Sequence, residues 1–298
     1  MNVFWKRMGF LGLAVTALLA SLSMQLIMGV IAMLPAAFMA GIEAGMSGIT
    51  DVSGIEELVM EKAMGSAIWG VLCYHVISLP VFGLWYYYGC GRHKPVSPIK
   101  IFRGKSFAGT CILGFGLCVV ANGIAMILQY LTPALFEEYL QLVENAGLGV
   151  DPVTIVASVI FAPVGEEILC RGIIMYYCEK MSQGIKNEKV SFWIANVVQA
   201  FFFGVMHANF VQGTYAFVLG MGLGLLTRRF KSLYPAMLCH FAVNFLSTFV
   251  MGRLFGWLPE NVAGTVIISG LGIVVTALAA WILREKQEKN SKETAVGL

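Results

Sequence analysis

Three charged residues interrupt an apolar run that is long enough to cross a membrane. Glu166, Glu167 and Arg171 lie inside VTIVASVIFAPVGEEILCRGIIMYY, residues 153–177. A charged side chain at the centre of a bilayer costs about 3 kcal/mol even on the lenient insertion scales. Such residues must therefore pair with one another or serve a function.

Helical spacing gives the two glutamates different surroundings. Glu167 and Arg171 are four residues apart and share one helix face, with the acid on the N-terminal side, which is the better order for an ion pair. Glu166 lies about 100° around the helix from Glu167 and cannot easily join that pair. The spacing predicts one carboxylate held by arginine and one left over. An unpaired acid inside a membrane is a candidate functional residue.

Partners for the remaining carboxylate come from two other apolar segments. In NVVQAFFFGVMH, His207 shares a helical stripe with Asn196 and Phe203. In MLCHFAVNF, His240 and Asn244 are four residues apart and lie on one helix face. Each polar residue alone also fits a structural hydrogen bond between membrane helices. Because two of only four histidines fall in this group, the coincidence favours a site.

These residue types suit peptide-bond hydrolysis. Glu166 can act as a general base on a water molecule and then return the proton to a leaving amine. Histidine and asparagine donors can stabilise the oxyanion of a tetrahedral intermediate. Two histidines and a glutamate could equally ligate zinc, with the second glutamate as base. The HExxH signature is absent, so we expect no cofactor while leaving a divalent metal such as zinc open.

Composition places these residues in an integral membrane protein. The 298 residues are 58% hydrophobic and 12% charged, about half the charged fraction of soluble domains, and the mean hydropathy is +0.78. The expected partners are therefore the lipid bilayer and a peptide or protein substrate. The net charge of +3 is too small to indicate nucleic acid. The seven cysteines form no CxxC pair and read as small packing residues.

Apolar segments predict an all-α, polytopic bundle of about eight transmembrane helices. We expect a single membrane domain over 1–298, a motif-bearing protease core at about 150–250, and a tail at 284–298. The first span is expected to be retained rather than cleaved as a signal peptide. Segments 54–66 and 134–146 read as short amphipathic helices, and GMGLG at 220–224 as a close-packing motif. The predicted spans lie near 9–36, 67–88, 107–131, 152–178, 191–208, 213–228, 233–252 and 262–283.

Loop charges predict the orientation of these spans. Basic or mixed segments alternate with acidic or neutral ones around all eight spans. The first group is Lys6-Arg7, 92–105, 179–189, 228–231 and the tail; the second includes 41–66 and 132–151. Under the positive-inside rule, the protein is a multi-pass protein of the cell membrane with both termini in the cytoplasm.

Three motifs resemble those of a known family. EEILCR (166–171) matches EExxxR, FGVMH (203–207) matches FxxxH and HFAVN (240–244) matches HxxxN. In this order on successive apolar helices, they resemble the CPBP (Abi) family of intramembrane endopeptidases, which includes CAAX-processing and bacteriocin-processing proteins. The resemblance covers about 150–250 and implies a metal-independent glutamate mechanism.

The resemblance also implies roles for single residues. Glu166 would activate water with help from His207, and His240 with Asn244 would form the oxyanion site. The supporting residues would be Glu167, Arg171 and Phe203, the last as the first residue of the FxxxH motif. Prenylated CAAX proteins are only one of the substrates that such proteins take, and no residue selects among them.

Two other classes of function stay open. A non-catalytic membrane protein, such as a bacteriocin-immunity or binding protein, would keep the same motifs as a binding site. A transporter or proton relay also places Glu and His inside a membrane, although paired broken helices and a two-half repeat are missing from the sequence. Depths counted at about 1.5 Å per residue spread the four catalytic candidates over about 9–24 Å. One site therefore requires tilted helices or shifted boundaries.

Overall fold

The described part of the chain is helical throughout. The computed structural model describes residues 3–90, 104–145, 152–259 and 261–296, with only the backbone for 144–145 and 284–296. Its elements are α1 Val3–Met46, α2 Val52–Gly65, α3 Ala67–Leu84, η1 Trp85–Gly89, α5 Lys105–Leu131, α6 Pro133–Asn145, α7 Pro152–Thr154, η2 Ile155–Phe161, α8 Ala162–Glu167, η3 Ile168–Ile174, α9 Met175–Met181, α10 Glu188–Val205, α11 Phe210–Phe230, α12 Tyr234–Leu246, η4 Ser247–Met251, α13 Gly252–Phe255 and α14 Val262–Val296. The four elements labelled η are π-helical.

Seven stretches of the described chain are long and apolar enough to span a membrane. They are Val3–Met46, Val52–Gly89, Lys105–Leu131, Pro152–Met181, Phe210–Phe230, Tyr234–Phe255 and Val262–Leu283. These contain seven of the eight predicted spans and confirm an all-α, polytopic membrane protein.

The remaining predicted span, 191–208, corresponds to α10, which is not among these seven stretches of the described chain. One face of α10 is exposed and apolar, whereas the opposite face buries Asn196 and Gln199. Asn196 donates to the carbonyl of Met221 and Gln199 to that of Gly220, both in α11. These hydrogen bonds hold α10 against α11.

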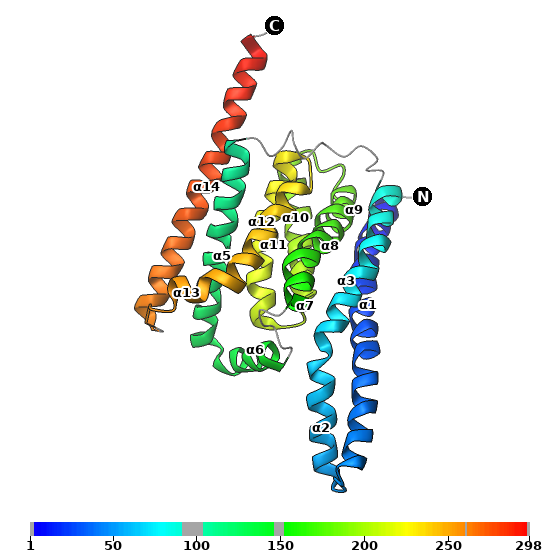
Figure 1. Cartoon of the computed structure of the whole chain (residues 1–298). Helices are drawn as coiled ribbons and strands as arrows, with labels where there is room; N and C mark the ends of the chain where they lie inside the picture. Colours follow the sequence, from blue (N-terminus) through cyan, green and yellow to red (C-terminus); the bar gives the residue numbers. More distant parts are fainter. Residues whose placement is uncertain (1–2, 91–103, 146–151, 260, 297–298) are drawn as a thin grey trace.

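The motif-bearing stretch 152–181 occupies the middle of the bundle. The pair α1–α3 packs on one side of it, and α12 and α10 contact it elsewhere. α5 packs along α14 and also contacts α12. The fully buried side chains of the stretch include Leu169, Cys170, Ile173 and Ile174. Figure 1 shows this green segment between the blue-cyan pair and the yellow helices.

Small residues allow the neighbours of this segment to approach closely. A Cβ atom added at Gly220 would lie 3.0 Å from Ala200 of α10, and one at Gly224 would collide with Asn196. The packing interpretation of GMGLG is therefore confirmed.

Both amphipathic predictions correspond to helices, α2 and α6. Asp51 caps α2 by accepting a hydrogen bond from the amide of Gly54 at 2.8 Å, and this bond lowers the pKa of the Asp51 carboxyl. α2 runs back along α1, where Lys62 lies 3.2 Å from Glu43. Figure 1 shows the α1–α2 hairpin extending past the end of the bundle where α6 lies, opposite the end where α1 begins and α14 ends.

Three predicted features fall partly outside the described residues. Most of the basic loop 92–105 lies outside the described residues. Residues 146–151 of the acidic segment and the last two residues of the tail also lie outside them. The rest of the tail continues α14 as a helix to Val296.

Candidate active site

The site begins with a break in the regular backbone bonding of η2. The amide of Ala162 donates to the carbonyl of Ala157, five residues earlier, so the matching donor for Ser158 would come from residue 163. Residue 163 is proline, which has no N–H group. The Ser158 carbonyl instead accepts a hydrogen bond from Nδ2 of Asn244 at 2.8 Å. Pro163 and the π-helical turn thus create the acceptor that orients Asn244.

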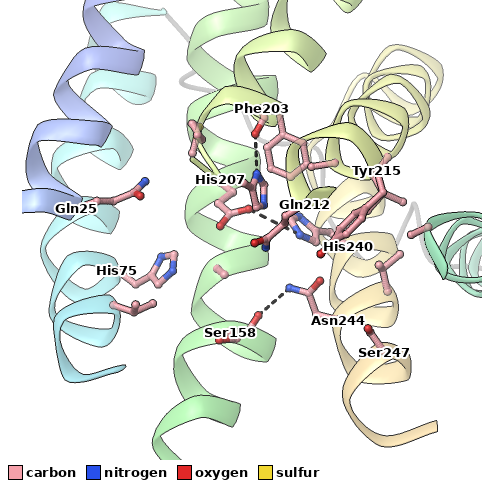
Figure 2. Close-up of a pocket in the computed structure, with 18 of the residues that line it drawn as sticks. Gln25, His75, Ser158, Phe203, His207, Gln212, Tyr215, His240, Asn244 and Ser247 are labelled. Carbon is pink, nitrogen blue, oxygen red and sulfur yellow. Dashed lines mark hydrogen bonds and ion pairs between the residues drawn. The ribbon is translucent and has the colours of Figure 1, made fainter. Parts of the chain in front are cut away.

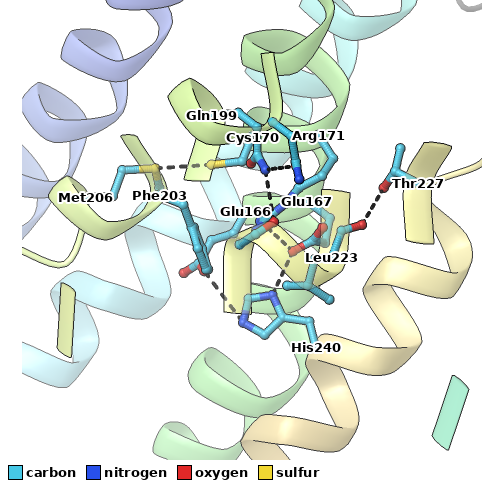
Figure 3. A network of polar contacts seen from close by, with 12 residues as sticks. Glu166, Glu167, Cys170, Arg171, Gln199, Phe203, Met206, Leu223, Thr227 and His240 are labelled. Carbon is cyan, nitrogen blue, oxygen red and sulfur yellow. Dashed lines mark hydrogen bonds and ion pairs between the residues drawn. The ribbon is translucent and has the colours of Figure 1, made fainter. Parts of the chain in front are cut away.

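Glu167 is completely buried and bonded on one oxygen. Its Oε1 accepts from Nη1 of Arg171 at 2.9 Å, and both side chains are 0% exposed. The same oxygen lies 2.9 Å from Nδ1 of His240. The predicted ion pair between Glu167 and Arg171 is present, and Figure 3 shows Glu167 between Arg171 and His240. The contact with His240 was not predicted from the sequence.

Glu166 lies in different surroundings, as the spacing predicted. Its side chain is 16% exposed, and its Oε2 lies 3.8 Å from Nε2 of His240, too far for a hydrogen bond. Glu166 lines a cavity of about 520 Å³. Of the two adjacent carboxylates, one is enclosed by its partners and the other faces open space.

His207 lies in the turn that follows α10. The next residue, Ala208, has a φ of +51°, which reverses the chain toward α11. Nδ1 of His207 lies 2.8 Å from the carbonyl oxygen of Phe203. Because a carbonyl oxygen can only accept, Nδ1 carries the proton, and in the neutral ring Nε2 is an acceptor. His207 lines the same cavity as Glu166.

Phe203 connects the two histidines and the arginine. Its ring meets His207 and His240 edge to face, with ring centres 5.0 and 5.6 Å apart. The Arg171 guanidinium carbon lies 4.3 Å from the centre of the Phe203 ring. This buried ring fixes the spacing of three polar side chains from two helices and a turn.

The cavity brings all four predicted catalytic residues together. Its lining includes Glu166, His207, His240 and Asn244. The depths that were counted from the sequence, which placed these four residues at different levels in the membrane, are therefore wrong. The calculation treated every span as a straight α-helix perpendicular to the membrane. Two π-helical turns flank α8, and Figure 1 shows α12 and α13 inclined to their neighbours.

A second group of lining residues was not assigned to the site from the sequence. Gln25 of α1 with Tyr74 and His75 of α3 faces the cavity, and Figure 2 shows Gln25 and His75 across from His240 and Asn244. The Tyr74 hydroxyl lies 2.7 Å from Ser21 Oγ, and His75 Nδ1 is buried without a hydrogen-bond partner among the described residues. The sequence does show these polar side chains within apolar runs. It gives no spacing that relates α1 and α3 to the three motifs, so their place in the site could not be predicted.

The donor set for zinc is incomplete. Within the described ranges, no group of three or more His, Cys, Asp or Glu side chains is placed to hold a metal ion. The Nδ1 atoms of His207 and His240 are engaged with Phe203 and Glu167, so only their Nε2 atoms could face a metal ion. The described side chains therefore do not assemble three ligands for a metal ion.

The geometry defines a polytopic membrane protein with a Glu/His/Asn site inside its bundle. Comparison with known proteins then shows what part of the chain resembles. Residues 149–246 match the family model for type II CAAX prenyl endopeptidase Rce1-like proteins. The chain is also 28% identical over 145 residues to "Putative membrane peptidase YdiL" of Bacillus subtilis. With the three motifs, these matches support a resemblance of 149–246 to the CPBP (CAAX-protease) family of membrane endopeptidases.

The coverage of these matches is partial. The alignment with the Bacillus protein covers 47% of this chain and 53% of that relative, so the chain spans about half the length of the curated relative it matches. No solved structure matches the chain.

Proposed function

We propose that this protein is an intramembrane endopeptidase that hydrolyses peptide bonds of membrane-associated peptides or proteins. The observation that carries the proposal is that two adjacent carboxylates lie in different surroundings. Glu167 is buried against Arg171 and His240, whereas Glu166 faces a cavity that His207 also lines. The similarity to membrane endopeptidases supports the same function.

The first step is activation of water by Glu166. The carboxylate accepts a proton from a water molecule while the water oxygen attacks the scissile carbonyl carbon. His207 assists because its Nδ1–H is held by the Phe203 carbonyl, which leaves Nε2 to accept a hydrogen bond from the same water. Neither a serine nor a cysteine nucleophile is required.

The second step is stabilisation of the oxyanion by His240 and Asn244. One N–H of the Asn244 amide is bonded to Ser158, and the other is left to donate to the oxyanion. His240 already donates its Nδ1–H to Glu167, so Nε2 can donate as well only when both ring nitrogens carry protons. The Glu167 carboxylate stabilises that imidazolium. When the C–N bond breaks, Glu166 returns its proton to the leaving amine.

The proposed location is the cell membrane, with the bilayer and a peptide or protein substrate as partners and no nucleic acid. We propose that both termini are cytoplasmic. Lys6 and Arg7 begin α1 and Arg228 and Arg229 end α11, at the end of the bundle where α14 finishes (Figure 1). Acidic residues gather at the opposite end, in the α1–α2 hairpin and α6. The positive-inside rule favours this orientation.

The test compares membranes that contain wild-type protein or Glu166→Gln at equal levels, with new peptide termini counted by mass spectrometry. Glu56→Gln, the same chemical change on exposed α2, is the matched control. We expect termini that are present with wild type and Glu56→Gln and absent with Glu166→Gln, and unchanged cleavage in a chelator. Identical profiles for all three would reject proteolysis and favour a binding or immunity protein.

A further inference from the structure

The cavity lies mainly toward one end of the bundle. Its lining from α11 comes from the first half of that helix, between Gln212 and Leu219, and its lining from α3 from the first half of that helix, between Ala67 and His75. On the descending stretch 234–255, the lining runs from His240 to Ser247. Tyr139 of α6 also contributes. The lining positions on α11, α3 and α6 lie toward the end of the bundle that α6 crosses in Figure 1, and those at 240–247 lie near the middle of their stretch.

The other end of the site is closed by a buried layer. Glu167 and Arg171 form an ion pair with no exposed side-chain surface. Ile174 and Leu223 beside them are no more than 1% exposed. Beyond this layer lies a separate pocket of about 260 Å³, lined by Arg171, Arg228, Lys231 and Ser232 among others, which shares no lining residue with the cavity.

The two ends also differ in charge. The closed end carries Arg228, Arg229 and Lys231 at the end of α11. The end that contains the cavity carries the acidic residues of the α1–α2 hairpin and Glu137 and Glu138 of α6. Because basic segments remain in the cytoplasm, the cavity extends from the middle of the membrane toward its outer side.

We infer that the active site is reached from the outer, non-cytoplasmic side of the membrane and takes a peptide segment that spans the membrane or has been exported across it. This inference rests on the proposed function and orientation. The cavity lies between the α1–α3 pair and α12, where Met33, Val71 and Val243 give it apolar walls suited to an apolar segment. The lipidated C-terminal tail of a cytoplasmic protein would meet the closed, basic end instead.

The first experiment measures which side of the membrane reaches the cavity. Single cysteines are introduced as Ser247→Cys, which lines the cavity, and Ser232→Cys, which lines the pocket beyond the buried layer. The background lacks Cys73 and Cys111, because the other native cysteines are buried. Correct insertion of each variant is checked by its yield in membranes and by its thermal unfolding in detergent. A charged, membrane-impermeant thiol reagent is then applied to intact cells and to inside-out vesicles.

We expect labelling of Ser247→Cys in intact cells and of Ser232→Cys only in inside-out vesicles. The reverse pattern, or a Ser247→Cys that reacts from neither side, would overturn the inference. Because labelling needs no catalysis, it separates this inference from the proposed function. Labelling from outside combined with unchanged peptide termini in Glu166→Gln would reject proteolysis and leave the outward opening in place.

A second readout concerns the substrate itself. The termini that depend on Glu166 are expected to map to segments in the outer half of the membrane or on its outer side. Cleavage confined to cytoplasmic C-terminal tails would contradict the inference even where proteolysis is established.

Discussion

The side-chain amide of Asn244 donates to the main-chain carbonyl of Ser158 at 2.8 Å and joins α12 to the segment that carries the glutamates. This acceptor exists because the backbone around it is π-helical and residue 163 is a proline without an N–H group. π-Helical turns in α-helices are often found at functional sites. Here the turn places Asn244 beside the cavity that Glu166 lines.

Replacing Pro163 with alanine is expected to weaken catalysis without weakening the fold. The new N–H group can bond the Ser158 carbonyl and compete with Asn244. A misplacement of the Asn244 amide by about 1 Å would lower the rate by on the order of 100-fold. Removal of a helix proline should leave the unfolding temperature unchanged or raise it. The measurements are cleavage of a substrate segment and thermal unfolding in detergent; a loss of stability matching the loss of activity would contradict the prediction.

The two adjacent glutamates are expected to respond differently to the same substitution. Glu166→Gln removes the proposed general base and should lower the rate by on the order of 100-fold to 10,000-fold. It should leave stability unchanged, because Glu166 approaches His240 only to 3.8 Å and has no shorter polar contact with the described residues. Glu167→Gln leaves Arg171 buried without a counter-ion and should destabilise the fold by about 3–5 kcal/mol.

Parallel denaturation and cleavage measurements on these two variants separate the roles. An unstable Glu166→Gln together with a stable, inactive Glu167→Gln would mean that the assignments are reversed.

Coupling between Glu167 and Arg171 can be measured with a double-mutant cycle. Each single change, Glu167→Gln or Arg171→Met, leaves the other side chain of the ion pair buried without its counter-ion. The double variant leaves neither charge buried. We therefore expect the double variant to be less destabilised than the sum of the singles, by about 1–3 kcal/mol. Activity should stay low in the double variant, because His240 loses the carboxylate that stabilises its second proton. Additive stabilities would show that the two side chains do not act as a pair.

The helical period predicted much of the site from sequence. It separated Glu166 from Glu167, paired Glu167 with Arg171 and placed His240 with Asn244 on one face, and the structure shows each arrangement. These relations depend only on residues within one turn of a helix. They therefore hold wherever the helix forms, whatever packs against it.

Relations between helices could not be predicted in the same way. The bond between His240 and Glu167 joins residues 73 positions apart, and the contribution of His75 depends on how α3 lies against α8. A Cβ atom added at Gly165 would lie 3.5 Å from His75 Nδ1, an ordinary contact distance, so Gly165 faces His75. The π-helical turns around α8 also changed the depth of Glu166, since a count of residues assumes a regular rise. No periodic pattern in the sequence carries this information.

The close contact between α10 and α11 gives a packing prediction with an internal control. A Cβ atom at Gly224 would collide with Asn196 Oδ1 and lie 2.9 Å from Gln199 Nε2, and both amides are held by hydrogen bonds. Gly224→Ala should therefore destabilise the fold by about 1–3 kcal/mol. At Gly222 the new Cβ would meet only the flexible end of Leu117, at 3.1 Å, so Gly222→Ala should cost clearly less. Thermal unfolding in detergent measures both, and equal losses would mean that the amides can move aside and that close approach at Gly224 does not hold the two helices together.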